Sequence, residues 1–183
     1  DPADVEAKLT PHTRAILVTH MNGLSAPIAD YLEIAERHPH PKYGPPKVLG
    51  DAARALGGSY QGRKIGTGAW MTVFSLHTMK MMTTLGEGGM ITTDDAELMA
   101  RLRGLRQWGI VESEDLEIAR GKRGTGDAGW GSNYKLTKVQ AAVGLVQLRR
   151  LDEMIAPRVA LAGKRSEMLS DVPELTLPYE PAE

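Results

Sequence analysis

Four short stretches of consecutive apolar residues predict the strands of this chain. They cover residues 13–20, 47–50, 69–75 and 90–93. A strand with one solvent-facing side alternates apolar and polar residues, whereas a strand of a parallel sheet that is covered on both faces is apolar throughout. The pattern therefore predicts an α/β fold with a mostly parallel sheet and helices on both faces.

Amphipathic segments between and after these strands predict helices. Asp4, Pro27, Asp94 or Asp95, and Thr137 are of the types that begin helices. In the helix from Thr137, one apolar face is expected from Val139, Ala142, Val143 and Val146. The expected helices cover residues 4–9, 27–37, 95–105, a segment that begins at residue 137, and 151–170 with an interruption near Pro157. A short helical turn is expected after residue 51, and loops are expected over residues 38–46 and 109–133.

Composition and charge narrow the class of protein. The 183 residues are 42% hydrophobic and 25% charged, with a formal net charge of -1, so we expect no nucleic-acid or membrane-surface partner. The absence of cysteine excludes disulfides and thiolate metal sites. With no transmembrane-length apolar run and no signal peptide, a cytoplasmic protein is expected.

The two ends suggest a truncated chain. The first residue is not an initiator methionine, and the expected helix begins almost at once. The last residues follow an apolar run at 175–177 that resembles the start of a strand. We therefore expect a fragment of a longer protein, cut at both ends.

The segment FSLHTMKMMTTLGEGGM (74–90) concentrates candidate chemistry. Ser75, His77 and Lys80 follow one another where an apolar strand gives way to a glycine-rich turn. Another polar residue, Asp51, directly follows the strand at 47–50. The carboxyl ends of parallel strands meet at one edge of a sheet, where ligands bind, so these side chains are expected to converge.

Each of these residues also has an ordinary structural explanation. On local grounds the first expectation for Asp51 is a helix N-cap. Lys80 alone would be a solvated surface lysine, and His77 a satisfied, half-buried histidine. The GEGG run alone indicates only a tight turn, and Met79, Met81 and Met82 alone indicate gap-filling core residues.

Taken together, the residues fit pyridoxal 5′-phosphate (PLP). This cofactor requires an acidic partner for its pyridinium nitrogen, hydrogen-bond donors for its phosphate, and a lysine that forms a Schiff base with its aldehyde. Asp51, Ser75 and Lys80 supply these groups in turn. A lysine released from the Schiff base can then carry a proton.

These segments resemble the DegT/DnrJ/EryC1/StrS aminotransferases, which are fold-type I PLP enzymes with an aspartate aminotransferase-like large domain. The resemblance spans residues 48–98, including DAARALG, FSLHTMK and GEGG, and continues through 101–109 and 132–153. It implies that Asp51 pairs with the ring nitrogen, Ser75 contacts the phosphate and Lys80 forms the Schiff base. It also implies that Asn133 reaches the cofactor of a neighbouring subunit, which requires a homodimer with shared active sites.

The implied activity is transfer of an amino group from an amino acid, usually L-glutamate, to a keto group, typically of a nucleotide-linked sugar. The implied layout is a partial PLP-binding large domain over residues 1–150 and a helix leading into a small domain over 151–183. Two alternatives stay open: a non-catalytic regulatory or scaffold protein, and a PLP-dependent sugar-modifying enzyme of another reaction type. One subfamily replaces the Schiff-base lysine with histidine and dehydrates sugars, and Lys80 argues against that subfamily.

Two positions depart from the family pattern. Arg54 stands where the family has glutamine or histidine, so it either donates to the phenolic oxygen of the cofactor or is a surface residue. The segment THMNG (19–23) differs from the HLYG-like pattern near the substrate. The usual sugar specificity is therefore not implied.

Three further features carry alternative interpretations. The basic segment RGKRGTG (120–126) is either a solvated loop or a diphosphate site. Trp108 and Trp130 are either packed in a core or dimer interface or are substrate platforms. His20 either packs as a satisfied histidine or lines the pocket.

Overall fold

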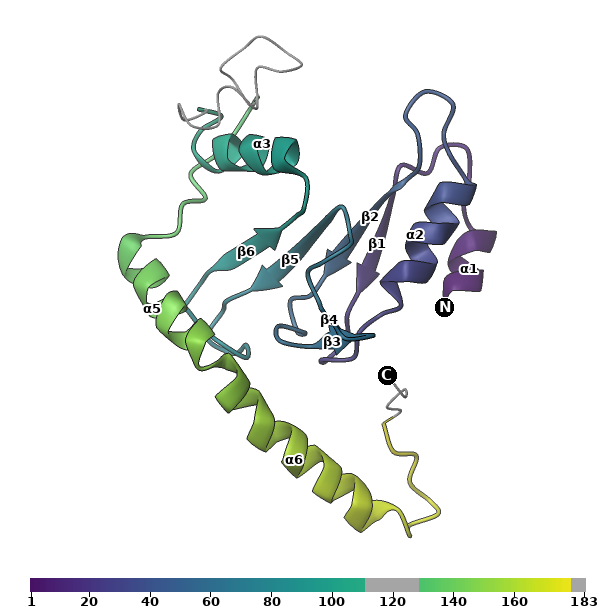
Figure 1. Cartoon of the computed structure of the whole chain (residues 1–183), viewed down its shortest axis with the longest axis vertical. Coiled ribbons are helices and arrows are strands. Elements are labelled where there is room, and N and C mark those ends of the chain that lie inside the picture. The colour runs from purple at the N-terminus through teal and green to yellow at the C-terminus, as the bar shows by residue number, and fades with distance from the viewer. Residues whose placement is uncertain (111–128, 179–183) are drawn as a thin grey trace.

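A four-stranded sheet organises the chain in the computed structural model, which describes residues 1–110 and 129–178. The strands are β1 (Ala15–Thr19), β2 (Lys47–Asp51), β5 (Met71–Ser75) and β6 (Gly89–Thr92). They lie in the order β1-β2-β5-β6; the first two pairings are parallel and β5 pairs with β6 antiparallel. The predicted mostly parallel sheet is confirmed, with an antiparallel edge strand (Figure 1).

Five helices accompany the sheet in the described residues. They are α1 (Pro2–Ala7), α2 (Ile28–Arg37), α3 (Ala96–Arg106), α5 (Lys138–Arg149) and α6 (Leu151–Leu169). Each corresponds to one of the helices expected from the amphipathic segments of the sequence.

One face of the sheet carries the core. Helix α2 packs on β1 and β2, and α1 packs on α2 (Figure 1). The core cluster joins Ile16, Val18 and Val48 from the strands to Tyr31 and Ala35 of α2. Burial of these apolar side chains removes them from water and drives the packing of the helix on the sheet.

The other face of the sheet is more open in the described part of the chain. Burial alternates along β1 and β5, with Leu17 68% exposed and Val73 39% exposed. Helix α2 thus covers β1 and β2 on one face, and these two residues lie on the opposite one. That second face is nevertheless apolar at both positions, which is why the sequence pattern predicts strands covered on both sides.

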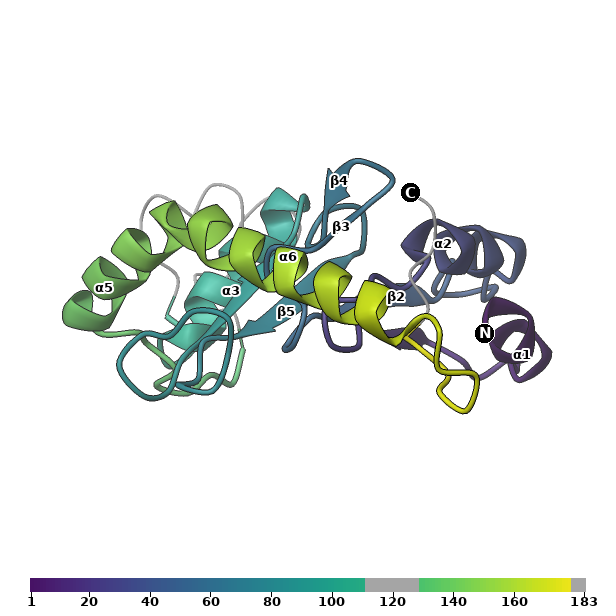
Figure 2. The same ribbon diagram turned by 90° about the horizontal axis from the view of Figure 1, so that it is seen from below.

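Helices α5 and α6 lie away from this core. α5 lies on the side of the molecule away from α1 and α2, and α6 continues from it as a long helix (Figures 1 and 2). Thr137 caps α5 as predicted, through a capping box with Gln140. The expected apolar face of α5 is largely exposed in this chain: Val139 and Val146 are 66% and 54% exposed, and the buried residue is Gly144.

Several local predictions differ from the structure. The first helix begins after Asp1, whose side chain accepts a hydrogen bond from the Ala3 N–H, rather than at Asp4. Residues 52–58 form turns and not a helical turn, and they lead into an unpredicted hairpin of β3 (Ser59–Tyr60) and β4 (Arg63–Lys64). Glycines at 57 and 58 favour turns over helix because of their backbone freedom.

The predicted interruption of the last helix is also wrong. α6 is continuous through Pro157. Proline removes one helical hydrogen bond, and the Arg158 guanidinium donates to the Met154 carbonyl at 2.6 Å in the same turns. In the described residues, the apolar run at 175–177 forms no strand, and no helix is long and apolar enough to span a membrane.

Candidate functional site

Lys80 lies in the loop that connects β5 to β6. The loop is closed by hydrogen bonds from the Leu76 N–H to the Gly88 carbonyl at 2.8 Å and from the Thr78 N–H to the Gly86 carbonyl at 2.9 Å. Gly86 has a φ of 129°, which favours glycine, and a Cβ at Gly88 would overlap the hydroxyl of Thr84. The glycine-rich turn therefore shapes the loop that carries the lysine.

His77 holds the same loop. Its Nδ1 accepts a hydrogen bond from the Met79 N–H at 3.1 Å, and its carbonyl accepts from the Lys80 N–H at 2.9 Å. Its Nε2 lies 3.5 Å from a carboxylate oxygen of Glu87. These contacts agree with the structural interpretation of His77, which positions the backbone on either side of Lys80.

A cleft of about 410 Å³ opens beside Lys80. Its volume lies within the usual range of roughly 300–1,000 Å³ for small-molecule sites. Three of the predicted cofactor residues, Arg54, Ser75 and Lys80, are brought together here from separate segments. The lining residues are Asn22, Ala53, Arg54, Leu56, Ser75, Met79, Lys80 and Met81.

The charges around this cleft are unbalanced. Arg54 and Lys80 are cations, and no carboxylate belongs to the lining residues. Within residues 1–110 and 129–178, the Lys80 ammonium has no hydrogen-bond or ion-pair partner. An ammonium and a guanidinium that line one cleft favour an anionic ligand, since the attraction lowers its free energy of binding.

Asp51 lies next to the cleft but not in its lining. Its Oδ1 accepts a hydrogen bond from the Ala53 N–H at 3.0 Å. The expected helix N-cap is wrong, because residues 52–58 form turns, so this bond closes a turn after β2. Asp51 is paired in register with Val73, two residues before Ser75, and the alternation of side chains places all three on one face of the sheet. The carboxylate therefore faces the same side as Ser75.

Asn133 is remote from the cleft lining of its own chain. It forms an isolated bridge with Gln107, just after α3, and it is exposed. The neighbouring Ser132 N–H donates to the Leu105 carbonyl at 3.0 Å, and the Tyr134 N–H to the carbonyl of residue 106 at 3.0 Å. The role of Asn133 toward a second subunit stays a prediction.

The segment that carries Asn133 depends on Gly131. A Cβ at residue 131 would overlap the backbone nitrogen of Gly109 and lie 2.5 Å from the Leu105 carbonyl oxygen. We expect Gly131→Ala to destabilise the intact protein by about 2–4 kcal/mol, because backbone atoms cannot move aside as a side chain can. Urea denaturation measures the effect. In the matched control Gly163→Ala, the new Cβ meets nothing within 4 Å, so stability should not fall; equal effects would contradict the prediction.

His20 is buried, 2% exposed, and its ring is hydrogen-bonded. Its Nδ1 accepts a hydrogen bond from the Ala26 N–H at 3.1 Å, so this nitrogen carries no proton. Burial lowers the pKa of His20 below its ordinary value, and the charge of Asp51 partly opposes this shift. His20 is absent from the lining of the Lys80 cleft and lies instead at a separate, smaller cavity.

This lowered pKa links stability to pH. The unfolded chain takes up a proton on His20 near the ordinary histidine pKa of 6.5, whereas the folded chain does so only at lower pH. The stability that neutral His20 contributes is therefore present above pH 6.5 and is lost as the pH falls toward the folded pKa.

A variant of His20 tests this linkage. We expect His20→Asn, whose side-chain oxygen can still accept from Ala26, to reduce the dependence of the unfolding free energy on pH below 6.5 by up to one proton. Urea denaturation at a series of pH values on the acid side measures the slope. Identical slopes for the two proteins would contradict the assignment to His20.

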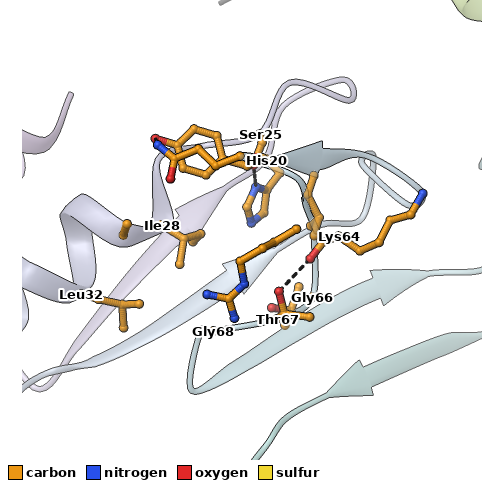
Figure 3. A pocket seen from close by; sticks show the side chains of 14 residues that line it. His20, Ser25, Ile28, Leu32, Lys64, Gly66, Thr67 and Gly68 are labelled. Atoms are coloured by element: carbon orange, nitrogen blue, oxygen red, sulfur yellow. Dashed lines mark hydrogen bonds between the residues drawn. The ribbon is translucent and has the colours of Figure 1, made fainter. Parts of the chain in front are cut away.

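The smaller cavity lies between α2 and the β3–β4 hairpin. Figure 3 shows Ser25, Ile28 and Leu32 on one side of it and the segment 64–68 on the other. The Thr67 hydroxyl donates to the Lys64 carbonyl at 2.9 Å and so ties this segment to itself. With about 80 Å³, this cavity is too small for a ligand of cofactor size.

The solvent exposure of the methionine and tryptophan side chains tests the roles expected for them. Met82 is 5% exposed, as predicted for a core residue, but Met79 is 85% exposed and lies in the cleft wall. Trp108 and Trp130 are 59% and 102% exposed, so burial in the core of this chain is wrong for both. Their packing at a dimer interface stays a prediction. The basic segment 120–126 lies outside the described residues.

Asn22 is a cleft residue that was indicated from the sequence only as part of the segment 19–23, which the family resemblance places near the substrate. It lies in the turn after β1, and its side chain lines the cleft beside Lys80. The signal that could have indicated it is the Asn-Gly pair at 22–23, which favours a turn directly after a strand. In a parallel sheet, such a turn lies at the edge where ligands bind.

The chain is similar in sequence and in fold to several known proteins. The chain is 37% identical over 174 residues to GDP-perosamine synthase of Caulobacter vibrioides, covering 93% of this chain and 42% of that protein. It is 36% identical over 178 residues to the erythromycin biosynthesis sensory transduction protein EryC1 of Saccharopolyspora erythraea, covering 97% and 44%. The crystal structure of the sugar aminotransferase CalS13 from Micromonospora echinospora superposes with a TM-score of 0.85 at 31% identity, covering 100% and 48%.

The chain thus spans less than half the length of each of these proteins. The model of one family matches all of it, residues 1–183. The fold is that of the PLP-dependent sugar aminotransferases among its structural neighbours. The chain belongs to the DegT/DnrJ/EryC1/StrS aminotransferase family.

Proposed function

We propose that the protein to which this chain belongs is a PLP-dependent aminotransferase. It would take an amino group from an amino acid, L-glutamate, and pass it to the keto group of a nucleotide-linked sugar. The observation that carries the proposal is the cleft in which Lys80, with no partner among the described residues, lies with Ser75 and Arg54. The names of the relatives, a perosamine synthase and a sugar aminotransferase, support the sugar acceptor.

The donor set of the cleft fits the cofactor. A phosphate requires hydrogen-bond donors, of which the Ser75 hydroxyl is one, and the Arg54 guanidinium complements the negative charge of the ligand. An aldehyde requires an amine that is not held in an ion pair, which Lys80 provides. When bound, PLP supplies the carbonyl that carries the amino group and the ring that accepts the electrons left by proton loss.

Three residues of the chain would hold or move protons and charge. In each half-reaction the Lys80 amine would take a proton from one carbon and deliver it to another, from the donor carbon to the cofactor in the first and from the cofactor to the acceptor carbon in the second, because an unpaired amine serves as base and then as acid. The Asp51 carboxylate would hold a proton on the pyridine nitrogen through its charge. Ser75 would donate its hydroxyl hydrogen to a phosphate oxygen and so orient the ligand.

A homodimer with shared sites completes the proposal. Asn133 is exposed and lies outside the cleft of its own chain, which supports a role toward a second subunit. The expected cytoplasmic location stays a prediction.

One experiment tests the proposal. The intact protein is mixed with PLP and L-glutamate, and the visible absorbance of the bound cofactor is followed. We expect a band that glutamate bleaches and that borohydride traps, with the reduced adduct mapped to Lys80 by mass spectrometry. A protein that shows no such band with excess PLP would not be an aminotransferase.

A second candidate is a non-catalytic regulatory protein. The name of EryC1, a sensory transduction protein, is the observation that favours it. The same titration separates the two, because a regulatory protein would bind PLP without losing the band to glutamate, or would not bind it.

A further inference from the structure

Asn22 and Arg54 meet at the wall of the Lys80 cleft. The Arg54 Nη1 donates to the Asn22 Oδ1 at 3.1 Å, although the two residues are 32 positions apart. Asn22 follows β1 and Arg54 follows β2, and these strands pair in parallel with Thr19 beside Asp51. Both residues line the cleft together with Lys80.

The backbone at Asn22 suits asparagine for a separate reason. The Leu24 N–H donates to the Met21 carbonyl at 2.9 Å and closes a turn. Asn22 and Gly23 occupy its centre with φ values of 53° and 93°. Asparagine adopts this left-handed region more readily than most residues. One residue thus shapes the turn and presents an amide oxygen to Arg54.

The partner of Arg54 is neutral, which matters for the charge of the cleft. In the described residues, Arg54 has no carboxylate partner, so the hydrogen bond to Asn22 orients the guanidinium without cancelling its charge. Both residues are exposed, and polar contacts between exposed side chains contribute little to stability. The main effect of this contact is therefore to fix the orientation of the Arg54 guanidinium.

We propose that Asn22 is a positioning residue that holds Arg54 to bind an anionic oxygen in the cleft. This inference rests on the proposed function. The oxygen belongs either to the phenolic group of the cofactor or to a carboxylate of the amino donor; guanidinium binds both through charge-assisted hydrogen bonds. The two positions that depart from the family pattern, in 19–23 and at Arg54, are therefore one contacting unit.

The test uses calorimetric titrations of the intact protein. The apoprotein is titrated with pyridoxamine 5′-phosphate, and the cofactor-loaded protein with glutarate, a dicarboxylate without an amino group. The variants are Asn22→Gly, which retains the left-handed turn, Arg54→Ala, and the double variant. We expect Arg54→Ala to weaken the binding of one of the two ligands, pyridoxamine 5′-phosphate or glutarate, about tenfold or more. Asn22→Gly should weaken the binding of the same ligand by a smaller factor.

The double variant decides whether Asn22 acts through Arg54. A positioning residue predicts that the double variant binds no more weakly than Arg54→Ala alone. Additive losses would overturn the positioning role, and unchanged binding in both titrations for Arg54→Ala would overturn the anion site. Asn22→Asp keeps the shape of the side chain and neutralises the charge of Arg54, so it should weaken the binding of the same ligand at least as much as Asn22→Gly does. If the wild-type protein binds no pyridoxamine 5′-phosphate, the proposed function is contradicted, and the proposed role of Asn22 and Arg54 is contradicted with it.

Discussion

Lys80→Arg is expected to abolish transamination in the intact protein, with a loss of roughly 10³-fold or more in kcat, because arginine can neither form the Schiff base nor exchange a proton near neutral pH. The substitution keeps a cation in the cleft lined by Arg54 and Ser75, so electrostatic attraction for the anionic cofactor remains. Binding should therefore persist while the borohydride-trapped adduct disappears. Turnover with L-glutamate and mass spectrometry measure the two effects.

A matched variant guards against a general effect of the substitution. Lys164→Arg makes the same change on the exposed surface of α6, and we expect wild-type turnover and adduct formation. If Lys80→Arg kept turnover within tenfold of wild type, Lys80 would not be the Schiff-base residue.

Asp51→Asn is expected to lower turnover by about 10³-fold, because the neutral amide cannot hold a proton on the pyridine nitrogen. The same variant should unfold at nearly the same urea concentration as wild type. The asparagine Oδ1 can still accept the 3.0 Å hydrogen bond from the Ala53 N–H, and asparagine forms such side-chain turns as aspartate does. The variant thus separates the catalytic interpretation from the structural one.

Asp95→Asn is the control for this experiment. Asp95 caps α3 by accepting from the Glu97 and Leu98 N–H groups at 3.0 Å. We expect no change in turnover and little change in stability. Near-normal turnover in Asp51→Asn would leave Asp51 with only its turn-closing hydrogen bond to Ala53.

Local features were predictable because they depend on neighbouring residues. Thr137 and Asp95 cap their helices as expected, since capping needs only a side-chain oxygen near the first N–H groups. The buried side of α5 was not predictable in this way. Its buried position is Gly144, where a Cβ would lie 3.0 Å from the Cγ2 of Thr84 in the distant loop, and no periodicity within α5 reports that contact.

The mostly parallel sheet was predictable from the apolar runs of the sequence, and the family and the residue types available for cofactor chemistry were predictable from the resemblance of its motifs. Which of those residues share a cleft follows from the fold. It joins Arg54, Ser75 and Lys80, leaves Asn133 apart, and adds Asn22. Parallel pairing brings the ends of β1, β2 and β5 to one edge of the sheet, as the apolar strands predict. Which side chains line the cleft there depends on the turn that follows each strand, such as the left-handed backbone at Asn22, and the spacing of residues along the chain does not specify that turn.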